Sequence, residues 1–205
     1  MADAGERGHD LDRVVFFSDA VFAIAMTILA LSLTIPTRTR DSRVAHALGH
    51  EVPAIVTYVV SFLVIGLNWM AHHRMFRYIR RLDTTSMLLN LAILCVVAFV
   101  PFPAAVLGDH GNTTAAVVFY AGTMAVLGVL MATFWLYATH DGRLIAVDTP
   151  EGLTEHTTWR AFTVPVVFLA SIPIAFANPN AAEWSWLAIA LVPILFRRRY
   201  GTIFE

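Results

Sequence analysis

The most informative ionisable side chain in this sequence is a carboxylate inside an apolar run. Asp19 follows Ser18 within the run from Val14 to Ile35, and Arg13 directly precedes that run. A run of this length can cross the hydrocarbon core of a bilayer, about 30 Å thick, as one tilted helix. A charge at the centre of such a helix costs roughly 2.5–3.5 kcal/mol, so intramembrane carboxylates usually have a partner and a function. Asp19 could therefore relay a proton or accept hydrogen bonds from a neighbouring helix.

A second polar group supplies possible partners for Asp19. Trp69, His72, His73 and Phe76 end another apolar run and follow the helical spacing i, i+3, i+4, i+7, so they share one helix face. An indole N–H and an imidazole at the depth of Asp19 can form a hydrogen-bond network between helices. We expect no metal site, because adjacent histidines diverge by about 100° on a helix and no third ligand has suitable spacing.

The composition is that of an integral membrane protein. Of the 205 residues, 58% are hydrophobic and only 14% are charged, whereas a soluble domain needs more charge on its surface. The net charge of −1 gives no reason to expect a nucleic-acid partner. All 14 basic residues are arginine, a bias typical of GC-rich bacterial genomes.

Six apolar segments predict an all-α polytopic membrane protein in which residues 1–205 form a single domain. The predicted transmembrane helices cover about 14–35, 53–71, 87–107, 115–139, 162–177 and 181–196. The sequence from Asp83 to Ser86 predicts the N-terminus of the third helix, and Pro101 and Pro103 should distort its other end. The segment 140–160 is polar, and we interpret it as a loop.

Arginine placement predicts the orientation in the membrane. With six spans and the N-terminus inside, only Arg38, Arg40 and Arg43 would lie outside. The inside would hold Arg7, Arg13, Arg74, Arg77, Arg80, Arg81, Arg143, Arg160, Arg197, Arg198 and Arg199. Because positively charged loops remain cytoplasmic, we expect both termini in the cytoplasm.

One face of the first predicted helix is a row of aliphatic side chains with a single hydroxyl. Ile24, Thr27, Ile28 and Leu31 recur at i, i+3, i+4 and i+7. Asp19 lies about 140° away from Ile24 on the same helix. From the residues alone, this stripe would pack against lipid or another helix.

The motifs of the first three helices together resemble a known family. The sequence contains R-x-x-x-F-S-D from Arg13 to Asp19, W-x-x-H-H-x-x-F from Trp69 to Phe76, Asn90-Leu91, and F-x-P-F-P from Phe99 to Pro103. This combination resembles the transmembrane protein 175 family of potassium channels. The motifs lie within residues 1–107, and the rest of the chain agrees with the family only in its hydropathy.

The resemblance implies a potassium-selective channel: a homotetramer of six-helix chains in the plasma membrane or inner membrane of a bacterium. Helix 1 of each subunit would line the pore, with constriction rings at Ile24, Ile28 and Leu31 and a polar ring at Thr27. A structural network would hold helix 1 against its neighbours without touching the ion; its residues are Arg13, Phe17, Ser18, Asp19, Trp69, His72 and His73. We expect K⁺ as the permeant ion, no cofactor and no enzymatic activity.

Such a pore would select ions without the carbonyl filter of other potassium channels, because this sequence lacks TVGYG. Hydrophobic rings offer an ion no oxygen, so they can gate by dewetting. Selectivity would come from the lower cost of removing water from the larger ion, helped by a threonine hydroxyl ring.

Other functions are compatible with the residues. A proton-coupled secondary transporter could use Asp19 with His72 or His73 as a relay. The sequence shows no internal repeat, which weighs against such a transporter. A membrane enzyme lacks a Ser/His/Asp or zinc constellation in the predicted spans, and a structural or assembly subunit is compatible with the sequence.

Overall fold

The described part of the chain is built from helices. The computed structural model describes residues 2–33, 44–145 and 151–187. Its α-helices are α1 Ala2–Ile28, α2 Val44–His50, α3 Val52–Phe76, α4 Thr84–Phe99, α5 Pro101–His110, α6 Thr114–Thr139, α7 Glu151–Ala177 and α8 Pro179–Ser185. Short 3₁₀ turns follow α1 at Leu29–Ser32 and α6 at His140–Gly142. This part of the chain is therefore all-α, as the sequence predicts.

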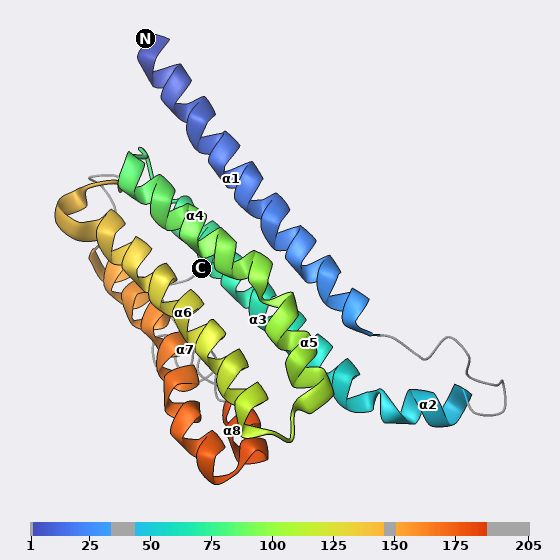
Figure 1. Cartoon of the computed structure of the whole chain (residues 1–205). Coiled ribbons are helices and arrows are strands. Elements are labelled where there is room, and N and C mark those ends of the chain that lie inside the picture. The colour runs from blue at the N-terminus through green and yellow to red at the C-terminus, as the bar shows by residue number, and fades with distance from the viewer. Residues whose placement is uncertain (1, 34–43, 146–150, 188–205) are drawn as a thin grey trace.

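The long helices lie side by side in an elongated bundle (Figure 1). Helix α1 lies on one flank, and its first turns extend beyond the neighbouring helices. The start of α1, the start of α4 and the end of α6 are at the same end of the bundle, whereas α2 and α8 lie at the other end.

Four helical segments are long and apolar enough to cross a membrane: Asp10–Ser32, Val52–Phe76, Thr84–His110 and Thr114–Gly142. A shorter apolar helix, Ala161–Ala177, matches the fifth predicted segment. The chain is therefore a multi-pass membrane protein. Of the sixth predicted segment, 181–196, the structure describes only the first residues, which belong to α8 and the turn after it; residues 188–196 lie outside the described part, as do the last two residues of 14–35.

Two local signals in the sequence act as expected on the third span. Asp83 caps α4: its carboxylate accepts a hydrogen bond from the Ser86 backbone N–H at 2.8 Å, and the Ser86 hydroxyl accepts one from the Asp83 backbone N–H at 2.9 Å. The span is then interrupted at Val100, where α4 ends and α5 begins with Pro101. Proline lacks the N–H that would continue the ladder of α4, which explains the break.

The predicted loop 140–160 is wrong in its second half. Helix α7 begins at Glu151 and continues through the polar residues up to Arg160 before it enters the apolar segment. Hydropathy marks only the part of a helix that contacts lipid or core, so it missed these first turns. Helix α1 likewise begins at Ala2, well before the apolar run, and α3 continues to Phe76.

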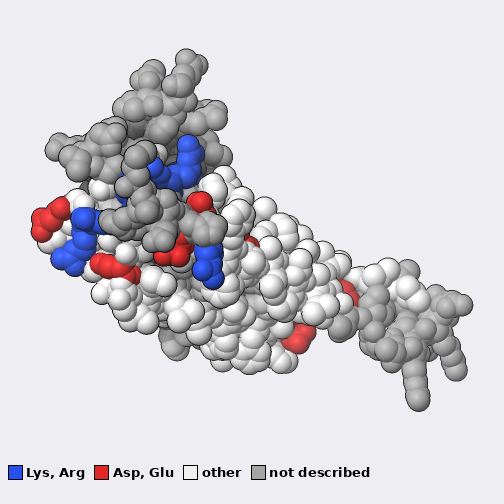
Figure 2. Space-filling view, turned by 90° about the horizontal axis from the view of Figure 1, so that it is seen from above, with Lys and Arg blue, Asp and Glu red and all other residues white. Residues whose placement is uncertain are grey.

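Charged side chains are concentrated at one end of the bundle. In the view from above, blue and red side chains form groups at one end, and the long body of the described surface is almost entirely white (Figure 2). At this end the loops after α3 and α6 meet: the Arg80 backbone N–H donates to the Leu144 carbonyl at 2.8 Å. The Nε of Arg81 also donates to the carbonyl oxygen of Arg143.

Helix α6 forms the centre of the bundle, and α1 and α3 lie on its periphery. The most apolar window of the α6 span is 61% buried, but the corresponding windows of the α1 and α3 spans are only 22% buried. Buried aromatic residues of α6, Tyr120, Phe134 and Trp135, anchor this core. Most apolar residues of α1 and α3 are therefore not fully buried within the described bundle.

Helices α6 and α7 are in close contact at Gly128. A Cβ atom at this position would lie 2.6 Å from Cδ and 2.9 Å from the backbone N of Pro165. Both residues are buried, and the proline ring is held by the helix that contains it. The absence of a side chain at Gly128 therefore permits the α6–α7 contact.

Gly128→Ala should destabilise the protein by about 1–3 kcal/mol, because the added methyl group must displace a rigid ring in a packed contact. Thermal unfolding in detergent measures this loss. Gly122→Ala is the matched control on the same helix, because a Cβ there meets no atom within 4 Å. Equal unfolding temperatures for the two variants would contradict the assigned contact.

Candidate functional site

Helix α1, together with the 3₁₀ turn that follows it, has two distinct faces within the described bundle. Ser18, Phe22, Ala25 and Leu29 are each at most 1% exposed and point into the protein. Their spacing of four, three and four residues is that of one side of an α-helix. The opposite side of α1 faces away from the protein's own core.

The exposed face carries the aliphatic stripe identified in the sequence. Ile24 is 56% exposed, Ile28 41% and Leu31 74%, and Thr27 is also exposed. The Thr27 hydroxyl donates a hydrogen bond to the Ile24 carbonyl at 2.8 Å, so its oxygen lone pairs remain available. The structure thus brings the four predicted pore residues together on a face that no described part of the chain covers.

A chain of buried polar side chains fixes the other face of α1. Nε2 of His72 on α3 lies 2.8 Å from Oδ1 of Asn90 on α4, and Nδ2 of Asn90 donates to Oγ of Ser18 at 3.1 Å. The Ser18 hydroxyl in turn donates to the Val14 carbonyl at 2.8 Å. Because the Asn90 oxygen accepts, Nε2 of His72 carries a proton in this arrangement. Three helices are joined by one fully connected network.

Aromatic rings enclose the imidazole of this network. The ring of Phe22 on α1 lies 5.4 Å from the His72 ring, and Phe76 stacks on it at 4.5 Å. Phe76 also stacks on Phe134 of the central helix α6 at 5.2 Å. The polar chain is therefore sealed by packing, which excludes water that could compete for its hydrogen bonds.

Asp19 forms a separate link to α3. Nε1 of Trp69 donates to Oδ1 of Asp19 at 2.8 Å, which is the contact expected from the helical spacing. The expected histidine contact differs: His72 bonds Asn90, and His73 is exposed beside the Trp69 ring at 5.7 Å. The two histidines diverge around α3, so only one of them faces the interior.

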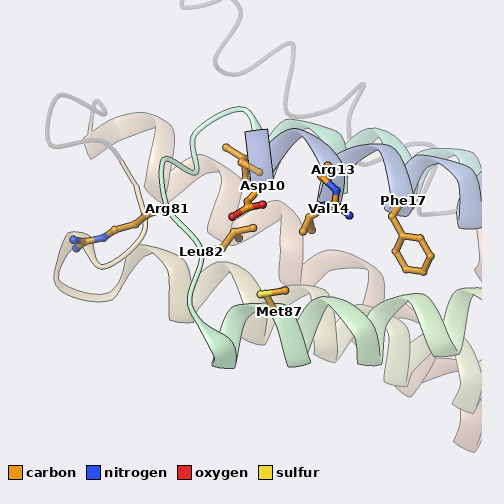
Figure 3. A pocket seen from close by; sticks show the side chains of 8 residues that line it. Asp10, Arg13, Val14, Phe17, Arg81, Leu82 and Met87 are labelled. Atoms are coloured by element: carbon orange, nitrogen blue, oxygen red, sulfur yellow. The ribbon is translucent and has the colours of Figure 1, made fainter. Parts of the chain in front are cut away.

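Arg13 and Phe17 do not join either link in the described structure. Both are exposed, and both line a groove between the start of α1 and the segment that leads into α4 (Figure 3). The groove has a volume of about 570 Å³. Its lining residues are Asp10, Leu11, Arg13, Val14, Phe17, Arg81, Leu82 and Met87.

A third cluster ties the two loops at the charged end of the bundle. The Tyr137 hydroxyl donates to Oδ2 of Asp83 at 2.6 Å, and the guanidinium of Arg143 lies 4.9 Å from the centre of the Tyr137 ring. The hydrogen bond from Tyr137, with those from Ser86, holds the pKa of Asp83 below its ordinary value. The Tyr137 hydroxyl also raises the pKa of Arg143. The sequence alone gave no sign of this cluster.

Within residues 2–33, 44–145 and 151–187, no group of three His, Cys, Asp or Glu side chains is arranged to hold a metal ion.

Comparison with known proteins identifies the family. The family model described as "Endosomal/lysosomal potassium channel TMEM175" matches residues 13–101. The potassium channel B446_29190 of Streptomyces collinus is 42% identical over 149 residues, which are 69% of this chain and 72% of that protein. The chain belongs to the TMEM175 family. It is therefore a member of a family of ion channels, as the motifs predicted.

Two further TMEM175 relatives extend the comparison. A crystal structure of a lysosomal potassium-selective channel TMEM175 homolog from Chamaesiphon minutus matches with a TM-score of 0.80 and 26% identity. That match covers 91% of this chain and 97% of the other. The human endosomal/lysosomal proton channel TMEM175 is 28% identical over 70% of this chain, and the match spans 29% of the human protein.

The sequence did not reveal that Asn90 is the central residue of the polar network. Asn90 entered only as part of a family motif, and its bonds to α1 and α3 depend on the tertiary arrangement. One signal was available: an amide within the long apolar run of α4 must find partners in the protein, because lipid offers none.

Asn90→Leu should destabilise the fold, because it leaves the donors and acceptors of His72 and Ser18 buried and unpaired at about 1–3 kcal/mol each. The measurement is the unfolding temperature in detergent. Asn68→Leu is the control, because the Asn68 side chain is also buried but bonds only the Val64 carbonyl of its own helix. A loss no greater than that of the control would exclude Asn90 as the link between the helices.

The Tyr137–Asp83 bond should make stability depend on pH at the acid end. Because the pKa of Asp83 is lowered, its contribution is present at neutral pH and decreases as the pH falls below about 4 toward the lowered pKa. Tyr137→Phe should therefore unfold more easily than the wild type at pH 7, and the difference between the two should shrink as the pH falls below about 4. Tyr78→Phe is the control, since the Tyr78 hydroxyl makes no hydrogen bond within the described part; an unchanged difference across this range would contradict the assignment.

Proposed function

We propose that this protein is a potassium-selective channel of a bacterial plasma membrane or inner membrane. Four copies would surround one pore, with α1 of each copy nearest the axis. The names of two relatives support this proposal: the Streptomyces protein is called a potassium channel, and the Chamaesiphon homolog a potassium-selective channel.

The exposed stripe of α1 is the observation that carries the proposal. Its aliphatic side chains point away from the core formed by the described helices, at 41–74% exposure. A lipid-facing helix would tolerate such residues, but it would need no polar chain to fix its rotation. The combination of a fixed inner face and an uncovered aliphatic face supports a helix that is positioned for contact with other copies and with a pore.

Permeation through this stripe would depend on water more than on coordinating oxygens. Rings of Ile24, Ile28 and Leu31 from four subunits would form a narrow aliphatic constriction, which empties of water unless an ion enters. K⁺ holds its water less tightly than Na⁺ and would cross at lower cost. The Thr27 ring, with lone pairs free, would supply the oxygens nearest the constriction.

The polar residues of α1 would act as positioning residues. The chain from Ser18 through Asn90 to His72, and the bond between Asp19 and Trp69, would set the rotation of α1 about its own axis. Their side chains point to α3 and α4, away from the stripe. Arg13, Phe17 and His73 lie outside these bonds, and we assign them to contacts at the edge of the subunit.

The distribution of arginine supports cytoplasmic termini. The loops after α3 and α6, which carry Arg77, Arg80, Arg81 and Arg143, meet at the end of the bundle where α1 begins. Positive loops remain on the cytoplasmic side of a membrane, so the N-terminus would be cytoplasmic too.

Proton permeation is the second candidate, because the human relative is named a proton channel. A relay would need Asp19 and His72 to exchange a proton. In this structure the Asp19 carboxylate accepts a hydrogen bond from Trp69 and His72 bonds Asn90, so these two side chains are not hydrogen-bonded to each other. The same geometry weighs against a proton-coupled transporter that uses Asp19 with His72 or His73.

Reversal potentials in planar bilayers test the proposed function. With K⁺ on one side and Na⁺ on the other, we expect single-channel steps and a reversal potential that favours K⁺. A reversal potential that follows the pH gradient instead would establish the proton channel. A transporter would give no single-channel steps.

Ile24→Asn should raise the conductance and weaken discrimination between K⁺ and Na⁺, because an amide ring keeps the constriction wet and offers oxygens to any cation. Val126→Asn on α6 is the control, since Val126 is 51% exposed but lies on another helix. Unchanged conductance and selectivity in Ile24→Asn would move the filter away from this ring, most directly to Thr27.

A further inference from the structure

The groove beside the start of α1 has apolar walls and a basic rim. Leu11, Val14, Phe17, Leu82 and Met87 form the walls of the 570 Å³ space. Its polar lining consists of Arg13, Arg81 and Asp10, which leaves a net positive charge. Arg81 and Asp10 lie toward the same end of the groove, with the Arg81 side chain pointing away from Asp10, and Phe17 lies at the other end (Figure 3).

A large aromatic side chain projects from the opposite flank of the same helix. Phe16 is 75% exposed, more than any other large hydrophobic residue of the described part. On a helix with about 100° per residue, Val14 in the groove lies roughly 80° to one side of Ile24, and Phe16 lies roughly 80° to the other side. Arg13 and Phe17, which also line the groove, lie within about 20° of Ile24. The Val14 wall of the groove and Phe16 therefore lie on opposite sides of the aliphatic stripe.

A ring of identical subunits requires two different surface patches on each subunit, such as the groove and Phe16. Each subunit in a cyclic assembly contacts its two neighbours through two different patches, one on each side of the surface that faces the axis. Rotation about the membrane normal also keeps every residue at its own depth. Phe16 lies within the interval 10–17 that lines the groove, so the two patches are at matching depth.

The charges of the two patches are complementary. Asp12 is exposed and precedes Phe16 by one helical turn, on the same flank. Its carboxylate would lie nearer the start of α1, which is also the end of the groove where Arg81 lies. When the carboxylate of one subunit lies beside the basic rim of the next, its aromatic ring lies beside the apolar walls. This match favours one orientation of the two subunits over others.

We infer that Phe16 of each subunit inserts into the groove of the next subunit, with Asp12 facing Arg81 of that subunit. The occupant of the groove is thus a second copy of this chain. The inference rests on the ring of subunits in the proposed function, and it names the contact that closes the ring. Phe16 is the aromatic anchor of this interface, and the surrounding charges set its register.

Disulfide crosslinking tests the contact directly. In a Cys95→Ser background, the pair Phe16→Cys and Met87→Cys should give a ladder up to tetramer on a denaturing gel after mild oxidation. The matched control pairs Phe16→Cys with Leu88→Cys, because Leu88 is 61% exposed but does not line the groove. A ladder as strong in the control, or none in the first pair, would overturn the inference.

Two further variants separate the anchor from the charges. Phe16→Ala should raise the dissociation constant of the tetramer by roughly tenfold or more, as truncation of a buried aromatic anchor does. Phe176→Ala on α7 is the control at 73% exposure. Asp12→Arg and Arg81→Asp should each weaken the tetramer, and the double exchange should restore it.

The outcomes distinguish this inference from the proposed function. If the wild type is not a tetramer by light scattering or native mass spectrometry, the ring itself is wrong. If it is a tetramer but the Phe16–Met87 pair does not crosslink, only the groove assignment fails. A different result would show that lipid fills the groove and would overturn the inference: the wild type and Leu88→Trp retain bound phospholipid, whereas Met87→Trp loses it.

Discussion

The orientation of α1 depends on one set of hydrogen bonds buried among apolar side chains. Asn90 accepts from His72 and donates to Ser18, so it joins the three helices that carry these residues. A rotation of α1 by one residue would move Ser18 about 100° away from Asn90 and leave both groups unpaired. In a site without water, each unpaired group costs about 1–3 kcal/mol. The network therefore selects one rotation of α1.

That selection determines which residues of α1 remain exposed. With Ser18, Phe22, Ala25 and Leu29 buried, the stripe that contains Ile24 must face away from the bundle. Lipid supplies no hydrophobic driving force between helices. Hydrogen bonds and close packing must therefore hold the helices together, as burial of apolar surface does in water. The bonds of α1 and the Gly128–Pro165 contact are two examples in this chain.

The sequence predicted most of the helices and their faces because these depend on local patterns. The four long spans followed from the lengths of apolar runs, the start of α4 from Asp83 and Ser86, and the break before α5 from Pro101. The first turns of α7 were missed because they are polar, so that hydropathy could not distinguish them from a loop.

The sequence predicted contacts between helices only where the depth of a polar side chain left few possible partners. The bond between Trp69 and Asp19 followed from their matching depth, at which an indole N–H can donate to a carboxylate. The partner of His72 could not be predicted in the same way, since the choice between Asp19 and Asn90 depends on how α3, α4 and α1 pack together. The groove that contains Arg13 and Phe17 likewise arises from the path of the 81–87 segment, which no local pattern determines.

We propose that the buried hydrogen bonds turn one face of α1 toward the ion pathway. Single cysteines placed along α1 in a Cys95→Ser background, treated with a charged water-soluble thiol reagent during bilayer recording, test it directly. We expect that cysteines at Ile24, Thr27 and Leu31 reduce the current on reaction, whereas cysteines at Phe22, Ala25 and Leu29 do not react. Reaction at the second set with no effect at the first would contradict the assigned rotation of α1.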